Sequence, residues 1–239
     1  MRVETLGGGV EVLVSEAHTF GTDAFLLSDF ASARRGEIAC DLGCGCGIIP
    51  LLWFREASAA PGEAFGLELQ PEAAGLAFAS AARSGLEGRF TVLEGDLRNP
   101  PKELGAGKFD LVTCNPPYKK ADTGILSESG SDRIARHETA CTLTDVARAS
   151  ARLLRYGGRL CVCQLPERLP DIFCAMRRFK IEPKRLRTVQ EREDTPPWLV
   201  LVEGRLGGKP FLRMEKPLIL RENGADSPEL RKIYHGYRK

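Results

Sequence analysis

A four-residue motif, Asn115-Pro116-Pro117-Tyr118, stands at the end of an apolar run that begins at Phe109. An amino group conjugated to a ring or a carbonyl is a poor nucleophile because its lone pair is delocalised. The Asn115 side-chain carbonyl and the Pro116 backbone carbonyl are two acceptors for its N–H bonds, and the prolines stiffen the turn. Tyr118 is a flat surface on which an unpaired base can stack, a contact worth about 1–3 kcal/mol. The motif predicts methylation of a planar amino group by orientation, without a strong general base.

A glycine turn at Gly43–Gly47 ends an earlier strand-like run, 37–42. Ile48 stands where the dinucleotide pattern Gly-x-Gly-x-x-Gly requires its third glycine, so the turn favours a smaller nucleotide-type ligand. Glu68 ends the next strand-like run, 21 residues after Gly47, where an acidic side chain can grip ribose hydroxyls. Asp96 ends the third run and can accept a hydrogen bond from an adenine amino group. These strand ends predict one ligand that lies across a sheet.

Strand-length apolar runs alternate with helical patterns from residue 37 onward, which predicts an α/β fold with a doubly wound, mostly parallel sheet. We expect a final antiparallel hairpin in that sheet and an N-terminal β-hairpin around Gly7–Gly9. The long polar stretch 119–140 is typical of a mobile loop. The seven expected core strands are 37–42, 63–69, 89–95, 109–114, 158–165, 181–189 and 197–206, and the expected helices are 48–57, 71–84, 142–156 and 169–180.

Composition indicates an ordinary globular protein of 239 residues. We predict a single domain over 1–239, with an N-terminal segment (1–36), a core sheet (37–206) and a C-terminal extension (207–239). The sequence has neither an apolar run of membrane-spanning length nor a signal-peptide pattern at its start, so we expect a cytoplasmic protein without a membrane partner.

The net charge of +2 conceals an asymmetry between the two parts of the chain. Residues 1–147 carry 13 basic and 21 acidic side chains, a balance of −8, whereas 148–239 carry 21 and 11, a balance of +10. A basic half beside a catalytic half favours a polyanionic substrate, although charged residues can equally form solvated helix faces.

The eight cysteines include no Cys-x-x-Cys pair. Most of them fall in strand-like runs, in the glycine turn or in helical patterns, so we expect reduced, mostly buried thiols and no metal site.

Taken together, the motifs resemble those of class I S-adenosylmethionine-dependent methyltransferases that methylate amino groups, which have a Rossmann-like fold. Softer segments narrow the resemblance to the bacterial tRNA(Val) adenine-37 N6-methyltransferase family. These segments are Thr19–Leu27, Ala135–Glu138, Pro217–Leu220 and Lys232–Tyr234.

This resemblance implies S-adenosylmethionine as the cofactor and the N6 amino group of an adenine in the tRNA(Val) anticodon loop as the target. It implies that Asn115, Pro116, Pro117 and Tyr118 are catalytic, with Asn115 also beside the cofactor. The implied cofactor-binding residues are Thr22 and Asp23 in a closing segment, Asp41, Gly43, Gly45 and Gly47 at the methionine part, Glu68 with Leu69 at the ribose, and Asp96 with Leu97 at the adenine.

The basic C-terminal half and the pair Lys119-Lys120 suit phosphate contact with a tRNA partner, and His137 could approach the substrate from the loop. Three alternatives stay open from the residues. The same chemistry could act on a protein glutamine amide, as in release-factor methyltransferases, or on another RNA. A catalytically silent RNA-binding module is the third, and the intact Asn115 and Tyr118 argue against it.

Overall fold

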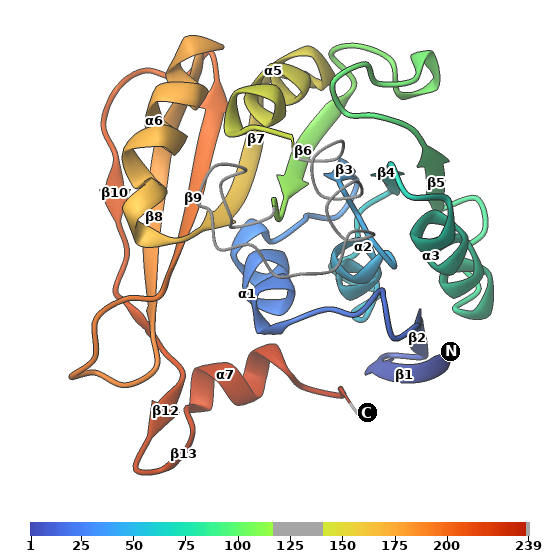
Figure 1. The fold of residues 1–239 in the computed structure, drawn as a ribbon, viewed down its shortest axis with the longest axis horizontal. Helices are drawn as coiled ribbons and strands as arrows, with labels where there is room; N and C mark the ends of the chain where they lie inside the picture. Colours follow the sequence, from blue (N-terminus) through green and yellow to red (C-terminus); the bar gives the residue numbers. More distant parts are fainter. Residues whose placement is uncertain (117–140, 238–239) are drawn as a thin grey trace, which may run out of the picture.

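A nine-stranded sheet forms the centre of the protein in the computed structural model, which describes residues 1–116 and 141–237 (Figure 1). The strand order is β10-β8-β9-β7-β6-β3-β4-β5, and β11 also pairs with β8. The strands are β3 (Ile38–Leu42), β4 (Glu63–Glu68), β5 (Phe90–Glu94), β6 (Phe109–Cys114), β7 (Leu154–Gln164), β8 (Ile181–Gln190), β9 (Leu199–Leu206), β10 (Arg213–Met214) and β11 (Leu218–Ile219).

All seven expected core strands are therefore present, and the short β10 and β11 extend the sheet at one edge. Strands β5, β4, β3, β6 and β7 run parallel, whereas β9 is antiparallel to both β7 and β8. The expected antiparallel finish is confirmed, with β9 inserted between β7 and β8. Because the parallel strands share a direction, the carboxyl ends of β3 to β6 meet at one edge of the sheet.

Helices cover both faces of the sheet, and residues of each strand alternate between two apolar cores. On β7, Leu160 and Val162 belong to the core beneath α5 and α6, whereas Cys161 and Cys163 belong to the core beneath α1 and α2. The helices are α1 (Thr22–Ala31), α2 (Ile48–Trp53), α3 (Pro71–Arg83), α5 (Leu143–Leu153), α6 (Leu169–Arg178) and α7 (Pro228–Ile233). Short 3-10 turns lie at Lys102–Leu104 and Pro166–Arg168. The doubly wound fold is thus confirmed.

The two ends of the chain lie together against the α1 side of the molecule (Figure 1). The expected hairpin is present as β1 (Arg2–Gly7) and β2 (Val10–Val14). The Tyr237 hydroxyl donates to the Glu4 carboxylate across an O···O distance of 2.6 Å. A second small hairpin, β12 (Arg221–Glu222) with β13 (Ala225–Asp226), precedes α7.

One expectation was wrong in detail, one helix was missed, and one expected loop falls outside the described residues. The helix expected over 142–156 ends at Leu153, because β7 begins at Leu154, which pairs with Phe109 of β6. Helix α1 was not expected as a helix. The loop expected over 119–140 lies outside the described residues. No helix in the described ranges combines the length and the apolar character that crossing a membrane requires.

Candidate active site

A cavity lies at the carboxyl ends of β3 to β6, the edge at which the sequence predicts the cofactor. Its volume is about 370 Å³, within the range of about 300–1,000 Å³ that is usual for small-molecule sites. Seven predicted site residues line it: Gly43, Glu68, Leu69, Asp96, Leu97, Asn115 and Pro116. Pro117, Tyr118, Lys119, Lys120 and His137 lie outside the described residues.

The glycine turn leaves open space at the floor of the cavity. Gly43 and Gly45 have φ values of +73° and +55°, and no atom would lie within 4 Å of a Cβ at either position. Gly47 has a different role, because a Cβ there would stand 3.1 Å from both Ala77 and Phe90. Gly43, which lines the cavity, permits a close ligand there, whereas Gly47 permits the turn to pack against α3 and β5.

Glu68 is buried, and its carboxylate is held by two backbone amides. Oε2 accepts from Gly45 N at 2.8 Å, and Oε1 accepts from Gln70 N at 2.9 Å. A carboxylate has about four lone-pair sites, so both oxygens retain acceptor capacity. The turn and the end of β4 thereby fix a hydrogen-bond acceptor on the cavity wall.

Asp41 lies beneath the turn and does not line the cavity. It is 1% exposed, and its Oδ1 accepts from Thr113 Oγ1 at 2.6 Å. Burial raises the pKa of Asp41 to about 8, the Thr113 hydrogen bond opposes that rise, and the nearby Glu68 carboxylate adds to it. Asp41 can therefore affect the cavity only indirectly, through the glycine turn that follows it and through Thr113 of β6.

Asp96 lines the cavity but is already engaged by a neighbour. Arg98 Nε donates to Asp96 Oδ1 and Oδ2 at 3.0 and 2.8 Å, and this bonding holds the Asp96 pKa below its usual value. Arg98 also lines the cavity. The acidic group expected at the adenine end is thus half of an ion pair, and any adenine amino group would meet an oriented carboxylate.

The Asn115 carboxamide lies between two side chains from distant parts of the sequence. Its Nδ2 donates to Asp23 Oδ2 at 2.9 Å, and its Oδ1 accepts from the Cys163 thiol at 3.0 Å. Asp23 and Thr22 do not line the cavity. The Thr22 hydroxyl accepts from the Tyr234 hydroxyl at 2.8 Å. The segment expected to close over the cofactor thus contacts Asn115 on one side and the C-terminal extension on the other.

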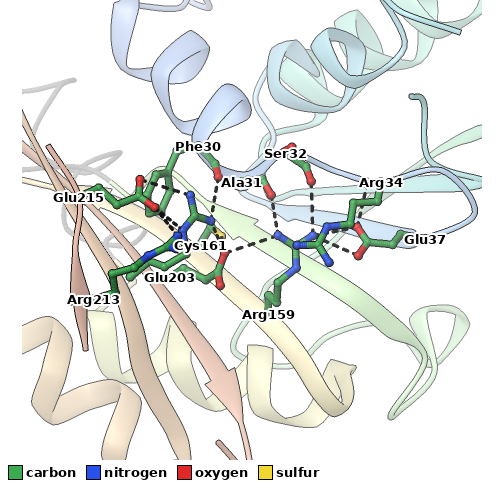
Figure 2. Close-up of polar contacts among 11 residues, drawn as sticks. Phe30, Ala31, Ser32, Arg34, Glu37, Arg159, Cys161, Glu203, Arg213 and Glu215 are labelled. Atoms are coloured by element: carbon green, nitrogen blue, oxygen red, sulfur yellow. Dashed lines mark hydrogen bonds and ion pairs between the residues drawn. The ribbon is translucent and has the colours of Figure 1, made fainter. Parts of the chain in front are cut away.

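A buried charged network holds the other end of α1 (Figure 2). The Ala31 carbonyl accepts from Arg159 Nη1 at 2.7 Å, and the Phe30 carbonyl accepts from Arg185 Nη1 at 3.4 Å. Glu203 on β9 lies between the two arginines, at 3.5 Å from Arg159 and 2.7 Å from Arg185. Cations at a helix C-terminus satisfy its last carbonyls, so strands β7 and β8 fix α1 from below.

Several buried cysteines are thiols of low reactivity. Burial raises the pKa of Cys40, Cys44 and Cys114 well above the usual value, and that of Cys46 to about 12. Among the described residues, no group of three or more His, Cys, Asp or Glu side chains is placed to hold a metal ion.

Comparisons with known proteins agree with this geometry. Residues 33–197 match the family model of the methyltransferase domain. The tRNA1(Val) (adenine(37)-N6)-methyltransferase of Porphyromonas gingivalis is 31% identical over 191 residues, which cover 77% of this chain and 73% of that protein. The chain belongs to this methyltransferase family. The relative of the same name from Tolumonas auensis is 29% identical and covers 87% of this chain and 85% of its own.

Solved structures show the same fold as this methyltransferase. The predicted O-methyltransferase Atu636 from Agrobacterium tumefaciens superposes with a TM-score of 0.70 at 23% identity, covering 90% of this chain and 96% of its own. Geranyl diphosphate methyltransferase in complex with S-adenosylmethionine gives a TM-score of 0.54 at 14% identity over 77% and 84% of the two chains. S-adenosylmethionine is the cofactor of this methyltransferase, and the open turn beside the fixed Glu68 carboxylate fits it.

Several cavity residues of the methyltransferase were not expected from the sequence. Gln70, Arg98 and Cys141 line the cavity, and Cys163 contacts Asn115. Arg98 could have been found from the sequence, because it lies two residues after Asp96. Cys163 carries no such sign: only the pairing of β7 beside β6 brings it to Asn115.

Proposed function

We propose that this methyltransferase transfers a methyl group from S-adenosylmethionine to the N6 amino group of an adenine in tRNA. The adenine is proposed to be position 37 of tRNA(Val), in the anticodon loop. The observation that carries the proposal is the Asn115-Pro116 strand end, which lies on the wall of the same cavity as Glu68 and Asp96. The relatives named for this reaction support the tRNA substrate. Because tRNA is present in the cytoplasm, the proposal also places the enzyme there.

The proposed chemistry requires acceptors more than acids or bases. When bound, S-adenosylmethionine supplies an electrophilic methyl group on a positively charged sulfur. Asn115 Oδ1 and the Pro116 carbonyl accept hydrogen bonds from the two N–H groups of the adenine amino group. These two hydrogen bonds turn the nitrogen lone pair out of conjugation with the ring and toward the methyl carbon. As the N–C bond forms, the bond between the methyl carbon and the sulfur would break, S-adenosylhomocysteine would leave, and the nitrogen would lose one proton to water. Pro117 holds the turn rigid, and Tyr118 stacks on the target base.

The cofactor is held in the orientation that the fold family implies. The Gly43–Gly47 turn, with Asp41 beneath it, takes the methionine end. Glu68 with Leu69 takes the ribose, and Asp96 with Leu97 takes the adenine. The fixed Glu68 carboxylate supports the ribose assignment, since its position is independent of any ligand contact. Thr22 and Asp23, expected in the closing segment, do not line this cavity, so the proposal gives them no cofactor contact.

The tRNA is proposed to bind partly through the basic half, 148–239. Many of its arginines pair with carboxylates, as Arg177 does with Glu182 at 2.7 Å. Arg178 and Lys180 have no carboxylate partner among the described residues and are the better candidates for phosphate contact. Phosphate contacts of this kind position the RNA, whereas contacts to the base edges read its sequence.

Tritium transfer from labelled S-adenosylmethionine tests the proposal directly. Purified protein is incubated with total tRNA or with total protein, and labelled tRNA is digested for nucleoside analysis. We expect label in N6-methyladenosine of tRNA. Asn115→Ala should reduce transfer by at least about 100-fold while cofactor affinity changes little, because this side chain acts on the target amino group. Label in protein glutamine with tRNA untouched would favour glutamine N5-methylation and overturn the proposal.

A further inference from the structure

The orientation of the Asn115 carboxamide decides whether it can act as an acceptor. Its two ends are nearly equal in size, but only Oδ1 accepts hydrogen bonds and only Nδ2 donates them. A rotation by 180° about the last side-chain bond would present a donor to an amino group that is itself a donor. The proposed reaction therefore needs a device that holds one of the two orientations.

We infer that Asp23 is that device, a positioning residue for Asn115; this inference rests on the proposed function. Asp23 Oδ2 lies 2.9 Å from Asn115 Nδ2, and the Cys163 thiol lies 3.0 Å from Asn115 Oδ1. A carboxylate is an acceptor only, so the Asp23 side of the carboxamide must carry the NH₂ group. The Cys163 thiol is a weak donor, and its bond to Oδ1 agrees with the same orientation of the carboxamide.

Asp23 is itself held in place by its backbone and by the start of α1. It lies in the first turn of that helix, where the helix dipole favours a negative charge. Its Oδ1 accepts from Ala24 N at 3.1 Å. A Cβ at Gly21 would stand 2.6 Å from this same Oδ1, so the absence of a side chain at Gly21 makes room for the carboxylate. Gly21 thus belongs to the positioning device.

The C-terminal extension packs against the start of α1 and supports the position of Asp23. The Tyr234 hydroxyl donates to Thr22 Oγ1 at 2.8 Å, and the Tyr234 ring lies 4.5 Å from the Phe25 ring, centroid to centroid. Arg55 holds the same segment by donating to the carbonyls of Ile233 and His235, both at 3.0 Å. The C-terminal extension therefore braces the first turn of α1, and α1 presents Asp23 to the catalytic strand end.

This role differs measurably from direct cofactor binding by Asp23. A cofactor ligand would change the dissociation constant of S-adenosylhomocysteine, whereas a positioning residue would change kcat at saturating cofactor. The chain offers a matched control in Asp171, which lies in the first turn of the equally long helix α6 and pairs only with Arg168 in the described structure.

Steady-state kinetics of Asp23→Asn, Asp23→Ala, Gly21→Ala and Asp171→Asn form the first test. We expect kcat for tRNA methylation to fall by about tenfold or more, about 1.4 kcal/mol, in the first three variants. The dissociation constant of S-adenosylhomocysteine should stay within about twofold, and Asp171→Asn should match the wild type. Gly21→Ala retains the carboxylate but displaces it, so it tests position separately from charge. An unchanged kcat with a weakened cofactor would overturn the inference.

Nitrogen-15 NMR of the side-chain amides provides a second test that needs no activity. The Asn115 amide signal is assigned by its loss in Asn115→Ala. We expect it to shift and to exchange faster with water in Asp23→Asn and Gly21→Ala, and to stay in place in Asp171→Asn. A signal that does not respond to Asp23 would refute the positioning role. Absence of tRNA methylation by the wild type would instead remove the proposed function, and this spectrum would still report whether Asp23 holds Asn115.

Discussion

Replacing Arg159 with methionine should destabilise the fold far more than a comparable change at the surface. Arg159 lies on β7 with 3% of its side chain exposed. It donates to Glu37 at 2.8 and 3.1 Å and to the Ala31 carbonyl at 2.7 Å, and it lies 3.5 Å from Glu203 (Figure 2). Methionine preserves much of the apolar stem but none of these donors.

The expected magnitude follows from what the substitution leaves behind. Removing one partner of a buried ion pair typically costs about 3–5 kcal/mol, because the other charge stays buried without compensation. Glu203 keeps Arg185 at 2.7 Å, and Glu37 keeps the Arg34 backbone amide at 2.9 Å. We therefore expect the lower end of the range, about 3 kcal/mol of unfolding free energy. At about 2–4 °C per kcal/mol for a chain of this size, the melting temperature should fall by about 6–12 °C.

Arg177→Met is the matched control, because Arg177 forms an equally short ion pair in a different environment. Its guanidinium lies 2.7 Å from Glu182, but 61% of the side chain is exposed. Exposed pairs of this kind contribute little to stability because water and salt screen them. Urea denaturation at pH 7, followed by circular dichroism, measures both variants. High salt should reduce the small effect at Arg177 and leave that at Arg159 unchanged, since buried pairs are screened much less. Equal losses in the two variants would refute the reasoning.

Three further predictions concern the cofactor, a buried acid and the tRNA. Glu68→Ala should weaken S-adenosylhomocysteine binding in calorimetry by about 1–3 kcal/mol, because the ribose loses an acceptor and Gly45 and Gln70 lose theirs; an unchanged affinity would count against the ribose assignment. Because burial raises the pKa of Asp41 to about 8 from 3.8, the folded protein retains a proton that the unfolded chain releases, so its unfolding free energy should fall as pH rises from about 4 to 8. Asp41→Asn should remove about 1.4 kcal/mol per pH unit from that slope in urea titrations, and an identical slope in both proteins would contradict the pKa shift. Affinity for tRNA in filter binding should fall by about tenfold or more between about 50 and 200 mM salt, and charge reversal at Arg178 and Lys180 should flatten that dependence without changing the methylated adenine; a flat salt profile in the wild type would argue against phosphate contacts.

Local sequence patterns were sufficient to predict the core of the sheet and the site at its edge. Strand β6 and the Asn115-Pro116 turn follow from an apolar run that ends in a rigid dipeptide. The glycine turn, Glu68 and Asp96 follow from the rule that parallel strands present their carboxyl ends together. Each of these features depends on residues within a few positions of one another.

Helix α1 could not be predicted in the same way. Seven of its ten residues are buried, among them Phe25, Leu26 and Leu27 in succession. A helix that is buried on nearly all sides has no polar face, so its sequence lacks the 3.6-residue periodicity by which surface helices are recognised. The end of α5 was misplaced for a related reason, because pairing with β6 draws Leu154 into β7 ahead of the glycines.

The sequence alone determined which candidate site features follow which strand. These are a glycine turn, two acidic strand ends and an acceptor motif, and each depends on neighbouring residues only. Only the tertiary structure decided what holds these groups. Asp23 meets Asn115 across 92 positions, and Tyr234 meets Thr22 across 212. Such contacts depend on where whole helices pack against the sheet. Hydrogen bonds over that separation leave no periodic trace in the sequence, because either partner is an ordinary polar residue until the fold brings the two together.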